Sequence, residues 1–308
     1  MNTAYWIYLL AVLLAGIAWM LFRAKKRGMK TAPVFTGVLL GTVLALALAK
    51  VLFIVLLSNK VWPRYGWASL LRLDAAEFSF FGGCLGMTLG MALSAKLHGI
   101  QPARLLSLFA PVGAFMASGV RAAEIFLDMQ GAGAYVENEA FARRPFAISN
   151  EWGEWFWAVF VLEAAAALIV AVVFARRKKE DAIDSLRFER VVYYLCVPQI
   201  FCESLRALGM RWGFVRIEQL LCGVIIEGLL IYGCVKCKNA KSFWNRFWPC
   251  FAAIGCVGVI VGVEFGLDKA PAISDWIWYC VMIAALIGYG ALECFVTKRR
   301  LCQLEKQS

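Results

Sequence analysis

The chain has 308 residues, of which 62% are hydrophobic and only 17% are charged. A soluble domain carries about one quarter charged residues, so this composition excludes a separate soluble domain as a major part of the chain. The net charge of +11 does not indicate a nucleic-acid partner, because the basic residues cluster in short loops between apolar runs and so signal membrane orientation.

Apolar runs recur along the whole chain. A helix of about 20 apolar residues crosses the hydrocarbon core of a bilayer. We therefore predict an all-α, polytopic membrane helix bundle of about nine transmembrane helices. The predicted spans are 4–22, 33–57, 78–95, 105–127, 152–175, 191–208, 218–235, 247–265 and 276–296. The sixth and seventh are the weakest, because Glu203, Arg206 and Glu218 interrupt them.

The basic residues set the predicted orientation. Most of the 32 lysines and arginines fall in every second loop, beginning with the loop after the first span. The positive-inside rule then places the N-terminus outside and the C-terminus in the cytoplasm. Two long loops, 58–77 and 128–151, lie outside. Trp152, Trp155 and Trp157 begin the fifth predicted helix, where aromatic rings suit the headgroup zone.

Glycines recur at four-residue spacing in three of the predicted helices. Such faces favour close helix packing, and a groove for a lipid tail is the alternative interpretation. The glycines are Gly37 and Gly41, then Gly82, Gly86 and Gly90, then Gly258 and Gly262.

The 11 cysteines lie mostly in apolar segments and are interpreted as buried thiols. Cys234 and Cys237 form a C-x-x-C at a helix end, but no second pair of ligands stands at suitable spacing, and His98 is the only histidine. We therefore predict no metal site, no cofactor and no disulfide framework.

Charged residues inside the predicted spans are the main functional signal, because a charge within a bilayer is retained only where it faces protein or water. Arg121, Glu124 and Asp128 share one helix face, running toward the outer surface. Glu203 and Arg206 form a second i, i+3 pair, and Lys50 and Glu163 lie in other spans. One interpretation is a set of structural ion pairs. The other is an outward-open polar cavity that holds an anionic headgroup against Arg121 and Arg206.

Several segments carry a resemblance to a known family. They are Leu48–Phe53, the glycine pair in Phe80–Gly86, the stretch from Ala110 to Phe126, and Phe201–Arg206 with Gln219 after it. These segments resemble motifs of the prolipoprotein diacylglyceryl transferases, bacterial membrane enzymes that move a diacylglyceryl group from phosphatidylglycerol to the thiol of a lipobox cysteine. The resemblance covers roughly residues 4–235. It implies a seven-helix core over 1–235 and a further two-helix extension with a basic tail over 236–308.

The resemblance also implies roles for the embedded charges. Arg121 and Arg206 match family arginines and would bind the lipid phosphate, with Lys50 in place of another family arginine and Glu163 in the substrate site. Glu124 or Glu203 would be the catalytic base. The implied location is the bacterial plasma membrane. The implied partners are phosphatidylglycerol and a lipoprotein precursor, with no nucleic acid.

The chain also departs from the family. Phe81 stands where the family has an essential histidine, and Glu124 stands where it has an asparagine. These departures favour an alternative, a non-catalytic relative that binds phospholipid or lipoprotein precursors or acts as a membrane scaffold. A transporter is a third possibility, which the odd helix count and the absence of a visible internal repeat argue against.

Overall fold

The computed structural model describes residues 3–74, 77–127, 129, 131–176, 185–207, 211–212, 215–237, 242–269 and 274–305. Within these ranges, eight helices are long and apolar enough to cross a membrane. They are α1 (Thr3–Lys26), α2 (Ala32–Leu56), α4 (Phe80–Leu97), α5 (Pro102–Ala122), α6 (Val159–Arg176), α8 (Ile217–Lys236), α9 (Phe243–Lys269) and α10 (Asp275–Glu305). The predicted helical bundle is confirmed at this level, and the apolar helices indicate a multi-pass integral membrane protein.

The sixth predicted span contains α7 (Leu186–Leu205). This helix carries Arg187, Glu189, Arg190 and Glu203, so its composition is less apolar than that of the other eight. A helix is therefore present at each of the nine predicted places. Nine crossings, and the orientation of the termini, stay predictions.

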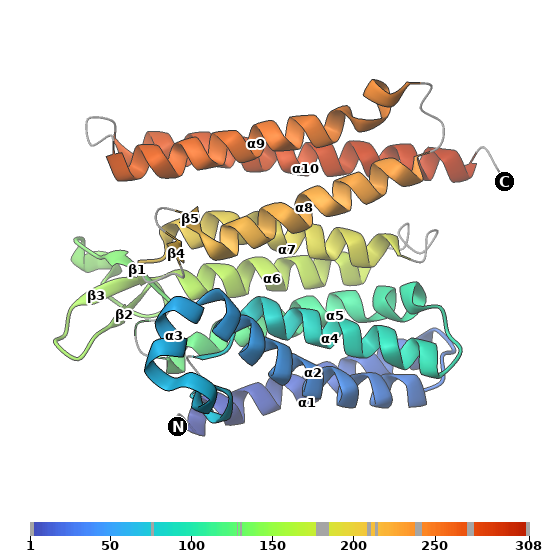
Figure 1. The fold of residues 1–308 in the computed structure, drawn as a ribbon, viewed down its shortest axis with the longest axis horizontal. Coiled ribbons are helices and arrows are strands. Elements are labelled where there is room, and N and C mark those ends of the chain that lie inside the picture. Colours follow the sequence, from blue (N-terminus) through green and yellow to red (C-terminus); the bar gives the residue numbers. More distant parts are fainter. Residues whose placement is uncertain are drawn as a thin grey trace. The chain divides into compact units, whose positions relative to one another are not determined.

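The chain divides into two compact units. The first comprises Met1–Val191 with Arg206–Leu208, and the second comprises Val192–Leu205 with Gly209–Ser308. The first unit holds α1, α2, α4, α5 and α6, which run side by side in Figure 1. The division of the chain at residue 235, which follows from the resemblance, stays a prediction.

Glycines allow α2 and α4 to pack with their backbones almost in contact. A Cβ atom built on Gly90 would lie 2.2 Å from the Cα of Gly41, and one on Gly86 would lie 2.4 Å from the backbone oxygen of Leu44. These residues therefore serve packing, as predicted. The same prediction is wrong for Gly258 and Gly262 on α9, because a Cβ there would meet nothing within 4 Å in the described structure.

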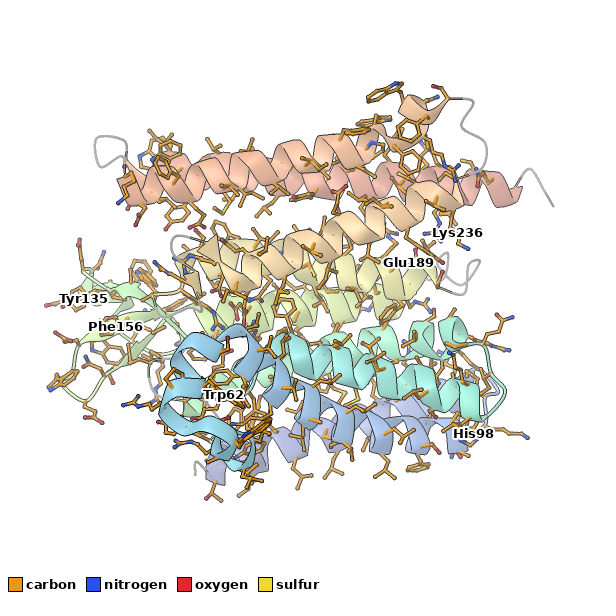
Figure 2. All side chains as sticks on the ribbon, viewed as in Figure 1. Trp62, His98, Tyr135, Phe156, Glu189 and Lys236 are labelled. Atoms are coloured by element: carbon orange, nitrogen blue, oxygen red, sulfur yellow. The ribbon has the colours of Figure 1, made fainter. Side chains whose placement is uncertain are left out.

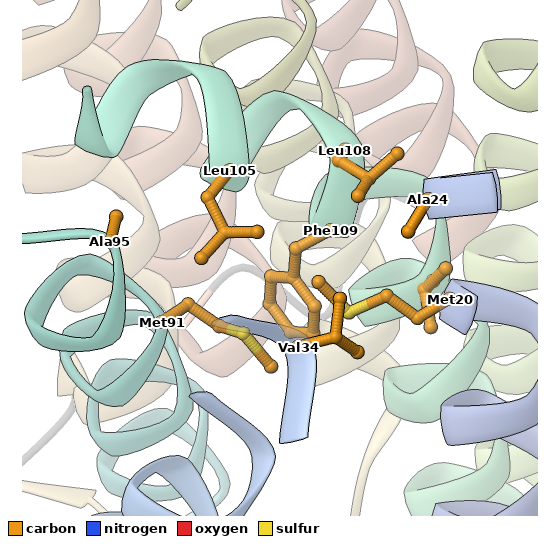
Figure 3. Close-up of a cluster of buried hydrophobic side chains, with 9 residues drawn as sticks. Met20, Ala24, Val34, Met91, Ala95, Leu105, Leu108 and Phe109 are labelled. Carbon is orange, nitrogen blue, oxygen red and sulfur yellow. The ribbon is translucent and has the colours of Figure 1, made fainter. Parts of the chain in front are cut away.

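A cluster of apolar side chains joins four helices near one end of the first unit. Met20 of α1, Val34 of α2, Met91 of α4 and Leu105 of α5 are all fully or almost fully buried and point toward one another in Figure 3. Each comes from the end of its helix next to a short connecting loop. Their burial fixes how these helix ends meet.

The opposite end of the first unit holds the two long connecting segments. Figure 2 places Trp62 and the pair Tyr135 and Phe156 at this end and His98 at the other. Residues 58–71 form the short helix α3 (Ser58–Tyr65) and the 3-10 helix η1 (Gly66–Leu71). Both long loops that the sequence predicts on one face of the membrane are therefore at one end of this unit.

The second long segment folds into a small antiparallel sheet that the sequence did not predict. Its strands are β1 (Ala132–Tyr135), β3 (Trp155–Ala158) and β2 (Ala147–Ser149), in that spatial order, with the 3-10 helix η4 (Glu139–Phe141) between β1 and β2 in the chain. Phe156 pairs with Tyr135 on one side and with Ile148 on the other.

The predicted start of the fifth span is therefore wrong. Trp155 and Trp157 lie on β3, and α6 begins only at Val159. A tight turn precedes the strand: the Asn150 side chain accepts hydrogen bonds from the amides of Trp152 and Glu154, and Gly153 has a φ of 79°. The aromatic strand continues directly into an apolar helix, so hydrophobicity alone does not mark the boundary.

The second unit contains most of α7 together with α8, α9 and α10, and a two-stranded ribbon of β4 (Arg211–Trp212) and β5 (Val215–Arg216). Figure 1 shows α9 and α10 side by side. The Tyr193 hydroxyl of α7 donates a hydrogen bond to the backbone oxygen of Tyr289 on α10 at 2.8 Å. This bond ties the two helices inside the unit.

Candidate functional site

Four charged side chains of the first unit form a closed ring. Arg121 comes from the last turn of α5, Glu124 from the 3-10 helix η3 (Ala123–Phe126) and Glu163 from α6, while Arg206 directly follows α7. We call these residues the charge ring. The sequence singled out all four as embedded charges, and the structure brings them together.

Each glutamate of the ring bridges both arginines. Glu124 is 2.7 Å from Arg121 through Oε1 and 2.7 Å from Arg206 through Oε2. Glu163 Oε2 is 3.0 Å from Arg121 Nε and 2.5 Å from Arg206 Nη2, and its Oε1 accepts a further bond from Arg206 Nε at 2.8 Å. The ring therefore alternates in sign and its four formal charges cancel.

The ring is buried, and its members differ in access. The exposed fraction is 1% for the Glu163 side chain, 5% for Arg121 and 8% for Arg206, and it rises to 11% for Glu124. Removing charges from water costs several kcal/mol per ion, and close opposite charges offset part of that cost. A balanced ring is thus a stable way to keep arginines inside this fold, and Glu124 is its most accessible member.

Local structure fixes Arg121 and Glu124. The helix continues from α5 into η3, so the two residues stand at i and i+3 on one face, as the stripe in the sequence predicts. The guanidinium carbon of Arg121 lies 4.0 Å from the centre of the Phe80 ring. Ser118, one turn before Arg121, donates a hydrogen bond to the backbone oxygen of Ala164 at 2.7 Å and ties α5 to α6 beside the ring.

The small sheet holds Arg206 in place. Arg206 forms an isolated antiparallel bridge with Gly133, and the Ala207 amide bonds to the Ala132 oxygen at 3.0 Å. Strand β1 thus positions the segment that follows α7 through these two backbone contacts. Just before β1, a Cβ on Gly131 would lie 2.6 Å from Oε2 of Glu124, so glycine leaves room for the carboxylate.

Sequence reasoning missed three residues around the ring: Phe80, Gly131 and Tyr5. The buried Tyr5 of α1 lies within electrostatic range of Glu124 and Arg121. Phe80 directly precedes Phe81, the position that the resemblance aligns with the family's histidine, so the resemblance could have pointed to this segment. Gly131 and Tyr5 carried no signal, because their proximity to the ring depends on how distant segments pack.

Lys50 does not join the ring in the structure. Its ammonium group lies 2.8 Å from Glu77, which also contacts Arg72 at 3.1 Å. The Phe78 ring is 5.1 Å from the same ammonium group. Glu77 was not singled out in the sequence, because it lies at the end of the loop between the second and third predicted spans, where a charged residue is expected.

Glu203 lies on α7 within the second unit and is 1% exposed. Its predicted i, i+3 partner Arg206 lies beyond the end of that helix, in the charge ring of the first unit. Asp128, the third member of the predicted stripe, falls outside the described residues.

The only histidine lies far from the ring in the first unit. The Nε2 atom of His98 is 3.1 Å from the Thr36 hydroxyl, at the end of the helices opposite the small sheet. His98 directly follows the last turn of α4, whereas Phe81, where the resemblance would place a histidine, lies in its first turn. Among the described residues, no group of three or more His, Cys, Asp or Glu side chains is placed to hold a metal ion.

Comparison with known proteins identified no relative of this chain. No family model matches the chain, and neither a curated protein nor a solved structure matches it significantly.

Proposed function

We propose that this protein is a lipid-dependent transferase of the bacterial plasma membrane, which transfers a diacylglyceryl group from phosphatidylglycerol to a cysteine thiol. One observation carries the proposal. The two arginines that match the family's motifs, Arg121 and Arg206, lie in one buried network although they are 85 positions apart in the sequence. Buried arginine forks suit a lipid phosphate, because two parallel N–H groups match two phosphate oxygens.

In the proposed reaction, the thiol sulfur bonds to the glyceryl carbon that carries the phosphate. The carbon–oxygen bond to the phosphate breaks, and glycerophosphate leaves with the electron pair. A base takes the thiol proton, and positive charge stabilises the leaving phosphate. Arg121 and Arg206 supply the positive charge, and Glu124 is our candidate base because it is the most accessible carboxylate of the ring.

The closed ring implies that the phosphate binds before the thiol loses its proton. As long as both glutamates pair with both arginines, the ring is neutral and offers a phosphate no net positive charge. An arriving phosphate therefore has to displace a carboxylate, and Glu124 is exposed to a greater extent than Glu163. We infer that the phosphate takes the place of Glu124 between the two arginines, and that the released Glu124 then accepts the thiol proton.

The test uses purified full-length protein, phosphatidylglycerol in detergent micelles and a synthetic lipobox peptide. We expect the peptide to gain the mass of a diacylglyceryl group, and we expect Glu124→Gln to abolish this gain. Arg143→Ala is the matched control, because Arg143 is exposed in the loop outside the ring. No gain of mass with the wild-type protein, under conditions in which a genuine diacylglyceryl transferase works, would contradict the transferase proposal.

A second candidate is a non-catalytic lipid-binding relative, which one observation favours. Phe81 stands at the histidine position, and His98 lies at the opposite end of the first unit and cannot replace it. This candidate predicts that phosphatidylglycerol binds and that Arg121→Ala weakens the binding, but that the lipobox peptide never gains mass. Binding without transfer therefore selects this candidate over the first.

A further inference from the structure

The end of α8 and the beginning of α9 bring two cysteines together in the second unit. The Cys250 thiol donates a hydrogen bond to the sulfur of Cys234, with 3.8 Å between the two sulfurs. The other cysteine of the C-x-x-C motif, Cys237, faces the backbone oxygen of Val296 on α10 instead. The partner of Cys234 is thus 16 residues away in the sequence.

Two further features distinguish this pair from ordinary buried thiols. Glu227, two helical turns before Cys234 on α8, lies within hydrogen-bonding reach of the Cys250 thiol. The pair also sits at a helix end, because α8 finishes at Lys236, two residues after Cys234. A carboxylate next to one thiol provides an acceptor for its proton.

We propose that Cys234 and Cys250 form a reversible disulfide that links α8 to α9 when a peroxide oxidises them. A disulfide needs its sulfurs at about 2.05 Å, and rotation of the two side chains about their Cα–Cβ bonds is the movement that closes the gap. Metal binding is the rival use of clustered cysteines. Within the described residues, these thiols and Glu227 do not form a group that is placed to hold a metal ion.

The chemistry balances with a peroxide as oxidant. The Cys250 thiol gives its proton to Glu227, its sulfur bonds to one peroxide oxygen, and the oxygen–oxygen bond breaks to release water and leave a sulfenic acid. The Cys234 sulfur then attacks the Cys250 sulfur, the sulfur–oxygen bond breaks, and a second water leaves. Two thiols and one hydrogen peroxide thus give one disulfide and two waters.

The burial of the two cysteines favours a small oxidant. Cys234 is 1% exposed and Cys250 is 6% exposed, so a small uncharged peroxide has better access than a bulky charged disulfide. The predicted topology places this helix end in the cytoplasm, where thiols are kept reduced. The link therefore forms only under oxidation and is reversed by cellular thiols, which makes it a redox switch between two helices.

The test oxidises the full-length protein in detergent micelles with hydrogen peroxide, alkylates the remaining thiols under denaturing conditions and digests with trypsin. Cleavage after Lys236 and Arg246 separates Cys234, Cys237 and Cys250 into three different peptides. We expect peptides Ile217–Lys236 and Phe247–Lys269 to be joined, with the loss of two hydrogens, and to separate after treatment with dithiothreitol. Cys250→Ser should abolish the link.

Matched controls make the result specific. The two joined peptides also contain Cys222 and Cys256, so the double variant Cys222→Ser, Cys256→Ser must keep the link if the proposal holds. A link between Cys234 and Cys237, or full alkylation of Cys234 and Cys250 after peroxide treatment, would overturn the proposal. We also expect oxidation to raise the melting temperature of the wild type but not that of Cys250→Ser, because a cross-link restricts the unfolded chain.

Discussion

At Arg121 and Arg206, each guanidinium faces two carboxylates and almost no solvent. An arginine in this setting is sensitive to the loss of any one partner, since the remaining charges stay buried and unbalanced. The same property separates the two interpretations of the embedded charges. If the ring is purely structural, its residues control stability alone. If it is a binding site, they also control affinity for an anionic lipid.

Removing one arginine should destabilise the protein strongly. We expect Arg206→Gln to lower the free energy of unfolding by about 3–5 kcal/mol, because it leaves Glu163 and Glu124 with a single buried arginine. Thermal melting in detergent measures the effect. Lys269→Gln is the control, since the Lys269–Asp268 pair is more than half exposed and should contribute almost nothing.

A double variant that keeps the ring neutral tests whether the four residues act as one network. The double variant Arg206→Gln, Glu163→Gln keeps the ring neutral, so it should lose less stability than the sum of its single variants. An additive loss would show that the two residues do not act as one network.

At the scale of elements, the long helices are determined by the sequence to a greater extent than the segments between them. Length and apolar content predict α1, α2 and α4 within a few residues. The same signals fail at Trp155–Ala158, because a short apolar strand that runs into a helix has no distinct period. The Asn150–Gly153 turn was the available signal, but the predicted boundary between the loop and the fifth span, after residue 151, cut through it.

The glycine face between α2 and α4 offers a test of helix packing. Gly86→Ala should destabilise the protein by about 1–3 kcal/mol, because the new methyl group meets the α2 backbone and the helices have to separate. Gly83→Ala on the same helix is the matched control, since its Cβ would meet nothing within 4 Å. Equal melting temperatures for the two variants would contradict the packing of these helices.

At the scale of the whole molecule, the helix count and the orientation are linked. With the N-terminus outside, nine crossings put the C-terminus in the cytoplasm, whereas eight crossings put both termini on the same side. The charged helix α7 decides between the two. Basic residues favour nine crossings, because they alternate regularly from loop to loop.

Reporter fusions at each terminus test this topology. We expect a C-terminal green fluorescent protein to be fluorescent, and an N-terminal alkaline phosphatase to be active, because the first folds in the cytoplasm and the second outside it. If both reporters instead indicate the same side, α7 does not cross the membrane and the predicted count of nine is wrong.

The candidate site shows what a single sequence can and cannot predict. The cost of charge in a bilayer identifies Arg121, Glu163 and Arg206 without any structure. It does not predict their partners, because the position of Arg206 depends on a backbone bridge to Gly133 of β1, which no local pattern indicates. Lys50 was predicted to share the substrate site with these residues, and its contact with Glu77 instead depends on a loop that carries no periodic signal.

The affinity of the purified protein for phosphatidylglycerol in Glu124→Gln tests the central claim most directly. If the lipid phosphate displaces Glu124 from the two arginines, neutralising this glutamate removes a competitor and should tighten binding by roughly tenfold, the equivalent of one charge-assisted hydrogen bond. Glu137→Gln, on an exposed loop residue, should leave the affinity unchanged. Unchanged or weaker binding in Glu124→Gln protein that melts cooperatively would contradict phosphate exchange and leave the ring with a structural role only.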